Sequence, residues 1–96
     1  MIDFDVSARR ALVTGCASGI GLATAVLLAR SGAHVAMNDV AEEPLAREVA
    51  SLRREGLAVE AVPGDLGAAA SARAVAAEAL RLLGGLDYLI NNAGAP

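Results

Sequence analysis

The residues best suited to bind a ligand form a glycine-rich segment, T-G-C-A-S-G-I-G, at positions 14–21. An apolar run, 11–13, precedes it, and a segment rich in alanine and leucine, 20–30, follows it. A turn between a buried strand and a helix presents unpaired N–H groups at the positive end of the helix dipole, which suits a pyrophosphate. Glycines allow positive φ angles and a close approach of backbone to phosphate. The segment therefore predicts an anion-binding turn, and a tight structural turn is the alternative.

The carboxylate of Asp39 indicates which ligand this turn would bind. Asp39 closes the second apolar run, 33–38, and follows Gly21 by 18 residues. In a doubly wound sheet that point lies beside the ribose of an adenosine group, whose two hydroxyls a carboxylate can bind. The same charge repels a 2′-phosphate by roughly 1 to 4 kcal/mol at ~4 Å, and residues 17–18 and 40–41 include no cation to offset it. We therefore expect NAD rather than NADP; a solvated turn aspartate is the alternative.

Strands and helices that alternate along the chain must position these groups. Strands are predicted at 11–13, 33–38, 57–62 and 86–91, and helices at 20–30, 41–55 and 68–83. The strands are too apolar for a sheet with one solvated face, so a parallel sheet with right-handed crossovers is expected. The prediction is an α/β, Rossmann-type doubly wound sheet in strand order 3-2-1-4. The first two helices should cover one face and the third helix the other.

Three motifs resemble those of the short-chain dehydrogenase/reductase family. The glycine spacing is T-G-x-x-x-G-x-G, which that family uses in place of G-x-G-x-x-G. Asp65-Leu66 matches the family's D-[VL] pair, and N-N-A-G at 91–94 matches its element after strand four. No G-K-[ST] sequence is present, which excludes a P-loop nucleotidase. The resemblance implies that residues 1–96 are the N-terminal part of a single NAD(P)-binding Rossmann domain, truncated after four strands, with the catalytic C-terminal part absent.

The resemblance also implies which residues bind the cofactor. The Asp65 carboxylate meets the adenine amino group, the Leu66 N–H meets a ring nitrogen, and the backbone of N-N-A-G passes beside the nicotinamide ribose. Without the family, Asp65 after Gly64 would be interpreted as a turn or helix-entry residue. The predicted cofactor-binding residues are Gly15, Cys16, Ser18, Gly19, Ile20, Gly21, Asp39, Val40, Asp65, Leu66, Asn92, Ala93 and Gly94.

The residues that would perform the family's chemistry are missing from these 96 positions. The family uses a Tyr-x-x-x-Lys helix and a serine, with the tyrosine as general acid/base for hydride transfer. This sequence contains no lysine, and its only tyrosine, Tyr88, falls inside a predicted strand. We assign no catalytic residue and no metal ligand. The expected function is an NAD-dependent oxidoreductase acting on an alcohol or carbonyl, present as its dinucleotide-binding segment and inactive alone. The alternative is a non-catalytic nucleotide-binding or scaffold module.

The composition indicates which partners and which cellular compartment to expect. The net charge of −3 gives no sign of the positive surface that binding to nucleic acid or to an anionic membrane requires. The longest apolar stretch, 22–29, is far shorter than the ~20 residues of a membrane span. A single cysteine, Cys16, and the lack of a leader favour a soluble cytoplasmic protein. Cys16 is interpreted as a small residue tolerated in the turn, with an activated thiolate as the alternative, and His34 as a buried core histidine. We expect a homo-oligomer, or pairing with a C-terminal piece.

Overall fold

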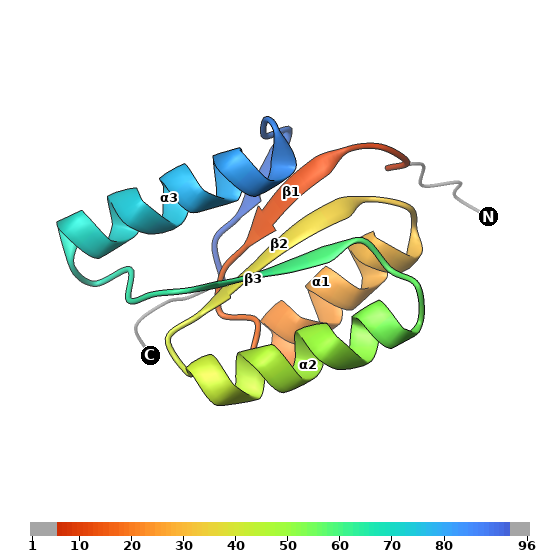
Figure 1. Cartoon of the computed structure of the whole chain (residues 1–96), viewed down its shortest axis with the longest axis horizontal. Coiled ribbons are helices and arrows are strands. Elements are labelled where there is room, and N and C mark those ends of the chain that lie inside the picture. The colour runs from red at the N-terminus through yellow and green to blue at the C-terminus, as the bar shows by residue number, and fades with distance from the viewer. Residues whose placement is uncertain (1–5, 93–96) are drawn as a thin grey trace.

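Four parallel strands form one sheet in the order β3-β2-β1-β4 (Figure 1). The computed structural model describes residues 6–92. Its elements are β1 (Arg10–Val13), α1 (Gly19–Arg30), β2 (His34–Asp39), α2 (Glu42–Arg54), β3 (Val59–Pro63), α3 (Ala69–Leu83) and β4 (Tyr88–Ile90). The predicted α/β class, parallel sheet and strand order are confirmed.

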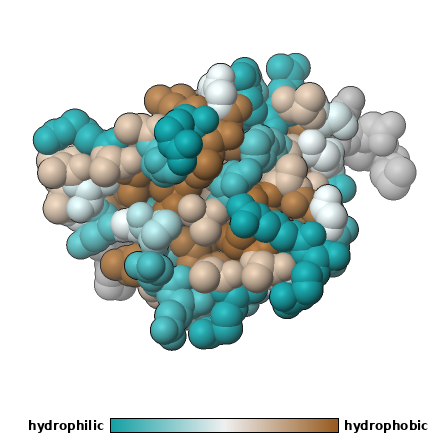
Figure 2. All heavy atoms as spheres, viewed as in Figure 1, coloured by the Kyte–Doolittle hydropathy of each residue, from teal (hydrophilic) through white to brown (hydrophobic). Residues whose placement is uncertain are grey.

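Helices α1 and α2 lie on one face of the sheet and α3 on the other, as predicted (Figure 1). Successive side chains of a strand point to opposite faces. Val13 and Met37 therefore pack toward α1 and α2, whereas Leu12 and Ala36 pack toward α3. Figure 2 shows hydrophobic atoms gathered in the middle of the face that it presents, between α3 and α2. The sheet is thus apolar on both faces, and polar groups for a site are found where the strands end.

The strands are shorter than predicted at two places, and each has a local cause. The fourth strand was expected at 86–91 but spans only Tyr88–Ile90. Just before β4 begins, the Asp87 carboxylate accepts the N–H of Arg10 at 2.8 Å. A side chain thus occupies the N–H group that would otherwise donate to a backbone carbonyl of the neighbouring strand. The third strand begins at Val59, two residues later than expected, because the chain leaves α2 through Gly56 with a left-handed φ of 85°.

His34 does not lie in the core, contrary to the interpretation from sequence. Its side chain is 31% exposed, and Nε2 lies 3.0 Å from Oε2 of Glu60. Arg53 of α2 also binds Glu60, at 2.7 Å, and its Nε donates to the Val59 carbonyl. His34 is the first residue of β2, so this cluster lies at the end of the sheet away from the glycine turn. Among residues 6–92, no helix combines the length and apolar character needed to cross a membrane.

Candidate functional site

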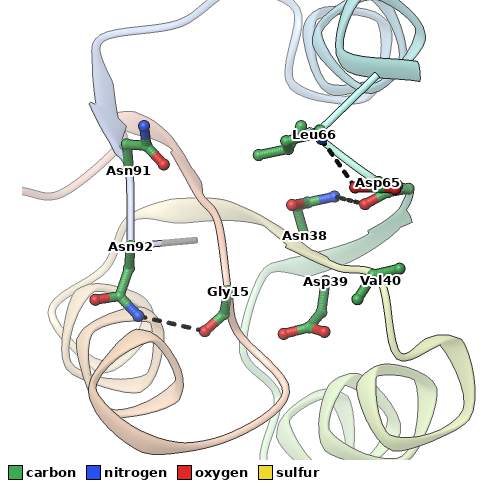
Figure 3. A pocket seen from close by; sticks show the side chains of 10 residues that line it. Gly15, Asn38, Asp39, Val40, Asp65, Leu66, Asn91 and Asn92 are labelled. Atoms are coloured by element: carbon green, nitrogen blue, oxygen red, sulfur yellow. Dashed lines mark hydrogen bonds between the residues drawn. The ribbon is translucent and has the colours of Figure 1, made fainter. Parts of the chain in front are cut away.

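A pocket of about 580 Å³ lies at the carboxyl ends of the strands (Figure 3). Strands β2 and β3 lie on one side of β1, and β4 lies on its other side. The strand order therefore reverses direction at β1, and open parallel sheets bind ligands at the carboxyl ends of the strands beside such a point. All four strands or the loops after them contribute to its wall. The lining residues are Gly15, Asn38, Asp39, Val40, Gly64, Asp65, Leu66, Gly67, Asn91 and Asn92.

The glycine turn leads into α1 with no side chain over the helix N-terminus. Ser18 precedes α1 in an extended conformation and makes no side-chain cap hydrogen bond, so the first N–H groups of the helix remain available to a ligand. Gly19 has a left-handed φ of 63°, and a Cβ there would meet nothing within 4 Å. Ile20 is 75% exposed. The start of α1 can therefore accept an anion.

Gly21 has the opposite environment, because it is buried below the turn. A Cβ at this position would collide with the carbonyl oxygen of Gly15 and lie 2.7 Å from Nδ2 of Asn92. Gly21 thus allows the helix to pack directly against the backbone of the turn. Its role is to shape the turn, and it does not line the pocket.

Asp39 joins the glycine turn to the start of α2. Its Oδ2 accepts the N–H of Ala17 at 2.9 Å, and its Oδ1 accepts the N–H of Ala41 at 2.9 Å. A carboxylate oxygen accepts more than one hydrogen bond, so both oxygens retain capacity for a ligand hydroxyl. Asp39 and the neighbouring Val40, which is 69% exposed, both line the pocket. The carboxylate is therefore fixed in orientation before any ligand binds.

Asp65 and Leu66, in the loop after β3, line the pocket above Asp39 in the view of Figure 3. Oδ1 of Asp65 accepts the N–H of Gly67 at 2.8 Å, which is an Asx turn. Asp65 is thus a turn residue, as its sequence neighbours alone suggested, and it also faces the pocket. The other carboxylate oxygen makes no hydrogen bond within residues 6–92.

The end of β4 is tied to the glycine turn by a short hydrogen-bond network. Thr14 Oγ1 donates to Asn91 Oδ1 at 3.0 Å and accepts the N–H of Asn92 at 2.9 Å. The Asn92 amide donates to the Gly15 carbonyl at 3.5 Å (Figure 3). Asn91 and Asn92 therefore brace β4 against β1, and Thr14 is a bracing residue that sequence reasoning did not single out. The remaining two predicted residues of this motif, Ala93 and Gly94, lie outside the described residues.

Cys16 is directed away from the pocket. Its side chain is fully buried, its thiol donates to the Val13 carbonyl at 2.9 Å, and its N–H donates to the Asn38 carbonyl at 2.8 Å. Burial raises the pKa of Cys16 to about 12. The group is therefore a neutral thiol, which fits the small structural residue and not the activated thiolate. Neither its N–H nor its thiol is available to a ligand in this conformation.

The structure brings six of the thirteen predicted residues onto the wall of one pocket. Those on the pocket wall are Gly15, Asp39, Val40, Asp65, Leu66 and Asn92. Ser18, Gly19 and Ile20 form the exposed start of α1, whereas Cys16 and Gly21 are buried behind the turn. Sequence reasoning missed Asn38, whose signal was a polar residue inside an apolar strand.

The charge of the pocket wall is negative. Asp39 and Asp65 are its charged residues, and no arginine lines it. Within the described residues, no cluster of three or more His, Cys, Asp or Glu side chains could hold a metal ion. This wall therefore suits a ligand that presents hydroxyl or amino donors to Asp39 and Asp65.

Comparison with known proteins gives a consistent result. The family model described as short chain dehydrogenase matches residues 9–96. The chain is 42% identical over 86 residues to human dehydrogenase/reductase SDR family member 2, mitochondrial, covering 90% of this chain and 31% of that protein. The chain thus spans about a third of the length of the curated relatives that it matches.

Two solved structures illustrate the similarity in three dimensions. A short chain dehydrogenase/reductase from Burkholderia phymatum, in complex with NAD, superposes with a TM-score of 0.85 at 36% identity, covering 91% of this chain and 31% of that one. A variant of actinorhodin polyketide ketoreductase with NADPH superposes with a TM-score of 0.86 at 35% identity, covering 92% and 34%. The neighbours therefore include complexes with either nicotinamide cofactor.

Proposed function

The chain belongs to the short-chain dehydrogenase family, and we propose that it is the dinucleotide-binding segment of an NAD-dependent oxidoreductase. The observation that carries the proposal is the position of Asp39. Its carboxylate lies at the end of β2, is fixed by two backbone N–H groups, and lines a pocket beside the uncapped start of α1. A ribose with two free hydroxyls joined to a pyrophosphate matches both features.

Each part of NAD has a matching group in the chain. The N–H groups at the start of α1 bind the pyrophosphate, and the glycines at 19 and 21 keep side chains out of the turn. Asp39 accepts hydrogen bonds from the adenosine ribose. Asp65 and Leu66 bind the adenine, and the motif that begins at Asn91 lies beside the nicotinamide ribose. When bound, NAD supplies the hydride acceptor of the reaction.

The charge of the pocket favours NAD over NADP. A 2′-phosphate on the adenosine ribose would stand beside Asp39, and the repulsion between like charges is worth roughly 1 to 4 kcal/mol at ~4 Å. The wall holds a second carboxylate, Asp65, and no basic residue. Relatives with NAD and with NADPH both exist, so family membership leaves the choice open. The argument for NAD rests on this local charge.

The 96 residues bind and orient the cofactor, and the proton chemistry belongs to another part of the protein. They are the N-terminal part of a single NAD(P)-binding Rossmann domain. Hydride transfer to or from an alcohol or carbonyl substrate also needs a group that moves the hydroxyl proton. The family's lysine-assisted tyrosine cannot occur in a sequence that contains no lysine. The chain alone is therefore inactive.

Calorimetric titration of the chain with NAD and NADP tests the proposal. NAD should bind, and NADP should bind at least tenfold more weakly. Tighter binding of NADP would overturn the role of Asp39, and a folded chain that binds neither cofactor would overturn the function.

One observation favours a second candidate, a nucleotide-binding module without catalysis: the sequence has no lysine, so nothing in it can assist a catalytic tyrosine. The two candidates differ in the rest of the protein. A Tyr-x-x-x-Lys sequence downstream in the gene supports the oxidoreductase. A gene product that lacks a Tyr-x-x-x-Lys sequence would support the nucleotide-binding module without catalysis.

A further inference from the structure

Asn38 is a buried polar residue to which the proposed function gives no role. It is 1% exposed and lies next to Asp39 near the end of β2. Its Nδ2 donates to the carbonyl of Val62 at 2.8 Å and to the carbonyl of Gly64 at 3.2 Å. Both partners are carbonyl oxygens, which only accept, so the amide nitrogen must face them and the orientation of the amide is determined.

The main chain of Asn38 adds a contact to the other side of the pocket. Its carbonyl accepts the N–H of Cys16 in the glycine turn at 2.8 Å. One residue thus contacts the turn after β1 through its backbone and the loop after β3 through its side chain. The two contacts can be separated by mutation, because a substitution removes the side-chain bonds and leaves the carbonyl in place.

The loop that Asn38 binds makes two other close contacts at Gly64. The N–H of Gly64 donates to the Asp39 carbonyl at 3.1 Å, and a Cβ at Gly64 would collide with Cγ2 of Val75 on α3. Gly64 is therefore held between β2 and α3. The next two residues, Asp65 and Leu66, line the pocket above Asp39 in the view of Figure 3.

We propose that Asn38 is a positioning residue that sets the distance between the two walls of the base-binding part of the pocket, through its hydrogen bond to Gly64. The inference rests on the proposed function, because it assumes that Asp65 and Leu66 bind a base. The bond to the Val62 carbonyl is buried and the bond to the Gly64 carbonyl is partly buried, and a carbonyl that loses such a donor shifts toward another donor or toward water. Without the Asn38 amide, Gly64 keeps only its N–H bond to the Asp39 carbonyl as a hydrogen bond to β2, so the loop after β3 can shift and the base loses its fitted wall.

The amide oxygen of Asn38 supports a role in the pocket beyond the fold. It accepts no hydrogen bond from residues 6–92, Asn38 lines the pocket, and the oxygen lies on the side away from Asp65 (Figure 3). A buried side chain with a free acceptor at a pocket wall can bind a ligand donor or an ordered water.

The variant Asn38→Leu tests the proposal, since leucine has a similar size and no donor. The probes are ADP, which has the base, and inorganic pyrophosphate, which needs only the glycine turn. The variant should bind ADP at least tenfold more weakly than the wild-type chain and pyrophosphate within twofold of it. Leu83→Ala is the matched control: it removes a buried side chain at the far end of α3 and should leave the ratio of the two affinities unchanged.

A measurement on the wild-type chain keeps the proposal testable if Asn38→Leu does not fold. The side-chain NH₂ resonances of Asn38 should exchange slowly with solvent, and they should shift on addition of ADP but not of pyrophosphate. Fast exchange, or equal shifts with both probes, would overturn the role of Asn38.

The outcomes separate this inference from the proposed function. If the wild-type chain binds ADP and Asn38→Leu loses ADP and pyrophosphate to the same extent, or loses neither, only the inference is wrong. If the folded wild-type chain binds neither probe, the proposed function and the inference are both wrong.

Discussion

The carboxylate of Asp39 accepts the N–H of Ala17 at 2.9 Å, so the end of β2 holds the glycine turn that follows β1. The other oxygen of the same carboxylate accepts the N–H of Ala41 at the start of α2. The group proposed to select the cofactor therefore also shapes the loop proposed to bind its pyrophosphate. A substitution at Asp39 changes both properties together.

This dual role predicts the behaviour of Asp39→Ala. The ratio of NAD affinity to NADP affinity should fall by about tenfold, or ~1.4 kcal/mol, because the repulsion of the 2′-phosphate is lost. Asp39→Ala should also bind both cofactors more weakly than the wild-type chain binds NAD. The reason is that the N–H groups of Ala17 and Ala41 lose their acceptor. Calorimetry with both cofactors measures the two effects. Glu43→Ala, which removes an exposed carboxylate of α2, is the control, and an unchanged ratio in Asp39→Ala would contradict the prediction.

Alanine substitutions at two glycines in the left-handed conformation should have different effects on NAD binding. Gly19 (φ 63°) and Gly56 (φ 85°) both have open space where a Cβ would be built. Each alanine should destabilise the fold by about 1 to 2 kcal/mol, the cost of the left-handed conformation. Only Gly19→Ala should also weaken NAD binding, by tenfold or more, because its methyl group covers the start of α1. Thermal melting and calorimetry on both variants check this, and equal NAD affinities would count against an anion site at the turn.

The ion pair between Arg10 and Asp87 should make stability depend on pH in acid. The hydrogen bond from the Arg10 guanidinium, with Nε 3.2 Å from Oδ2, lowers the pKa of Asp87 below its usual value of 3.8. Because the pKa of the folded state is the lower one, the stabilisation is present above the unfolded pKa and is lost as pH falls through the folded pKa. Asp87→Asn should therefore be less stable than wild type at pH 7, and the difference should disappear as pH falls through the folded-state pKa of Asp87, below 3.8.

Melting temperatures measured from pH 7 down to pH 2 test the role of this ion pair. Glu43→Gln is the control, since Glu43 makes no ion pair within residues 6–92. A constant difference between wild type and Asp87→Asn at every pH would contradict the prediction.

The chain should not oxidise alcohols by itself. It contains no lysine to support a catalytic tyrosine, and general acid/base assistance is worth ~10² to 10⁴ in rate. NADH absorbance at saturating NAD, with a panel of primary and secondary alcohols, should stay at the level of the buffer. Steady NADH production by the pure 96-residue chain would contradict the assignment of catalysis to another part of the protein.

The outer edge of β4 should mediate association between chains. Among the described residues β4 pairs only with β1, and Leu89 and Tyr88 are 61% and 42% exposed. Unpaired edge N–H and C=O groups beside apolar side chains favour pairing with another strand. We expect self-association, or stability only with a complementary C-terminal piece.

Sedimentation velocity over a range of concentrations tests the role of this edge. Leu89→Lys should reduce self-association, because a charged edge opposes strand addition. Leu27→Lys on α1, where leucine is equally exposed at 62%, is the control and should have a smaller effect. A wild-type chain that remains a monodisperse monomer at high concentration, with a single cooperative melting transition, would contradict the prediction.

The sequence by itself determined the order of the elements, the parallel sheet and the outline of the pocket. Those features depend on local properties: apolar runs of strand length, helical spacing, and glycines at the turn that joins β1 to α1. The chain direction and the handedness of crossovers then reduce the possible arrangements of four parallel strands to a few. Asp39 was recognisable because it ends a strand, and Asp65 because Asp65-Leu66 matches a pair of residues of the family.

Only the tertiary structure decided what the side chains inside this frame do. The partners of Asn38 lie 24 and 26 residues away in sequence, and Thr14 meets Asn91 across 77 residues. Such contacts depend on the register of β2 against β3 and of β1 against β4, which places particular atoms at hydrogen-bond distance from one another. No local pattern encodes that register atom by atom. For the same reason, Cys16 proved to be a buried neutral thiol and His34 a half-exposed partner of Glu60, since the burial of a group is decided by the elements packed around it.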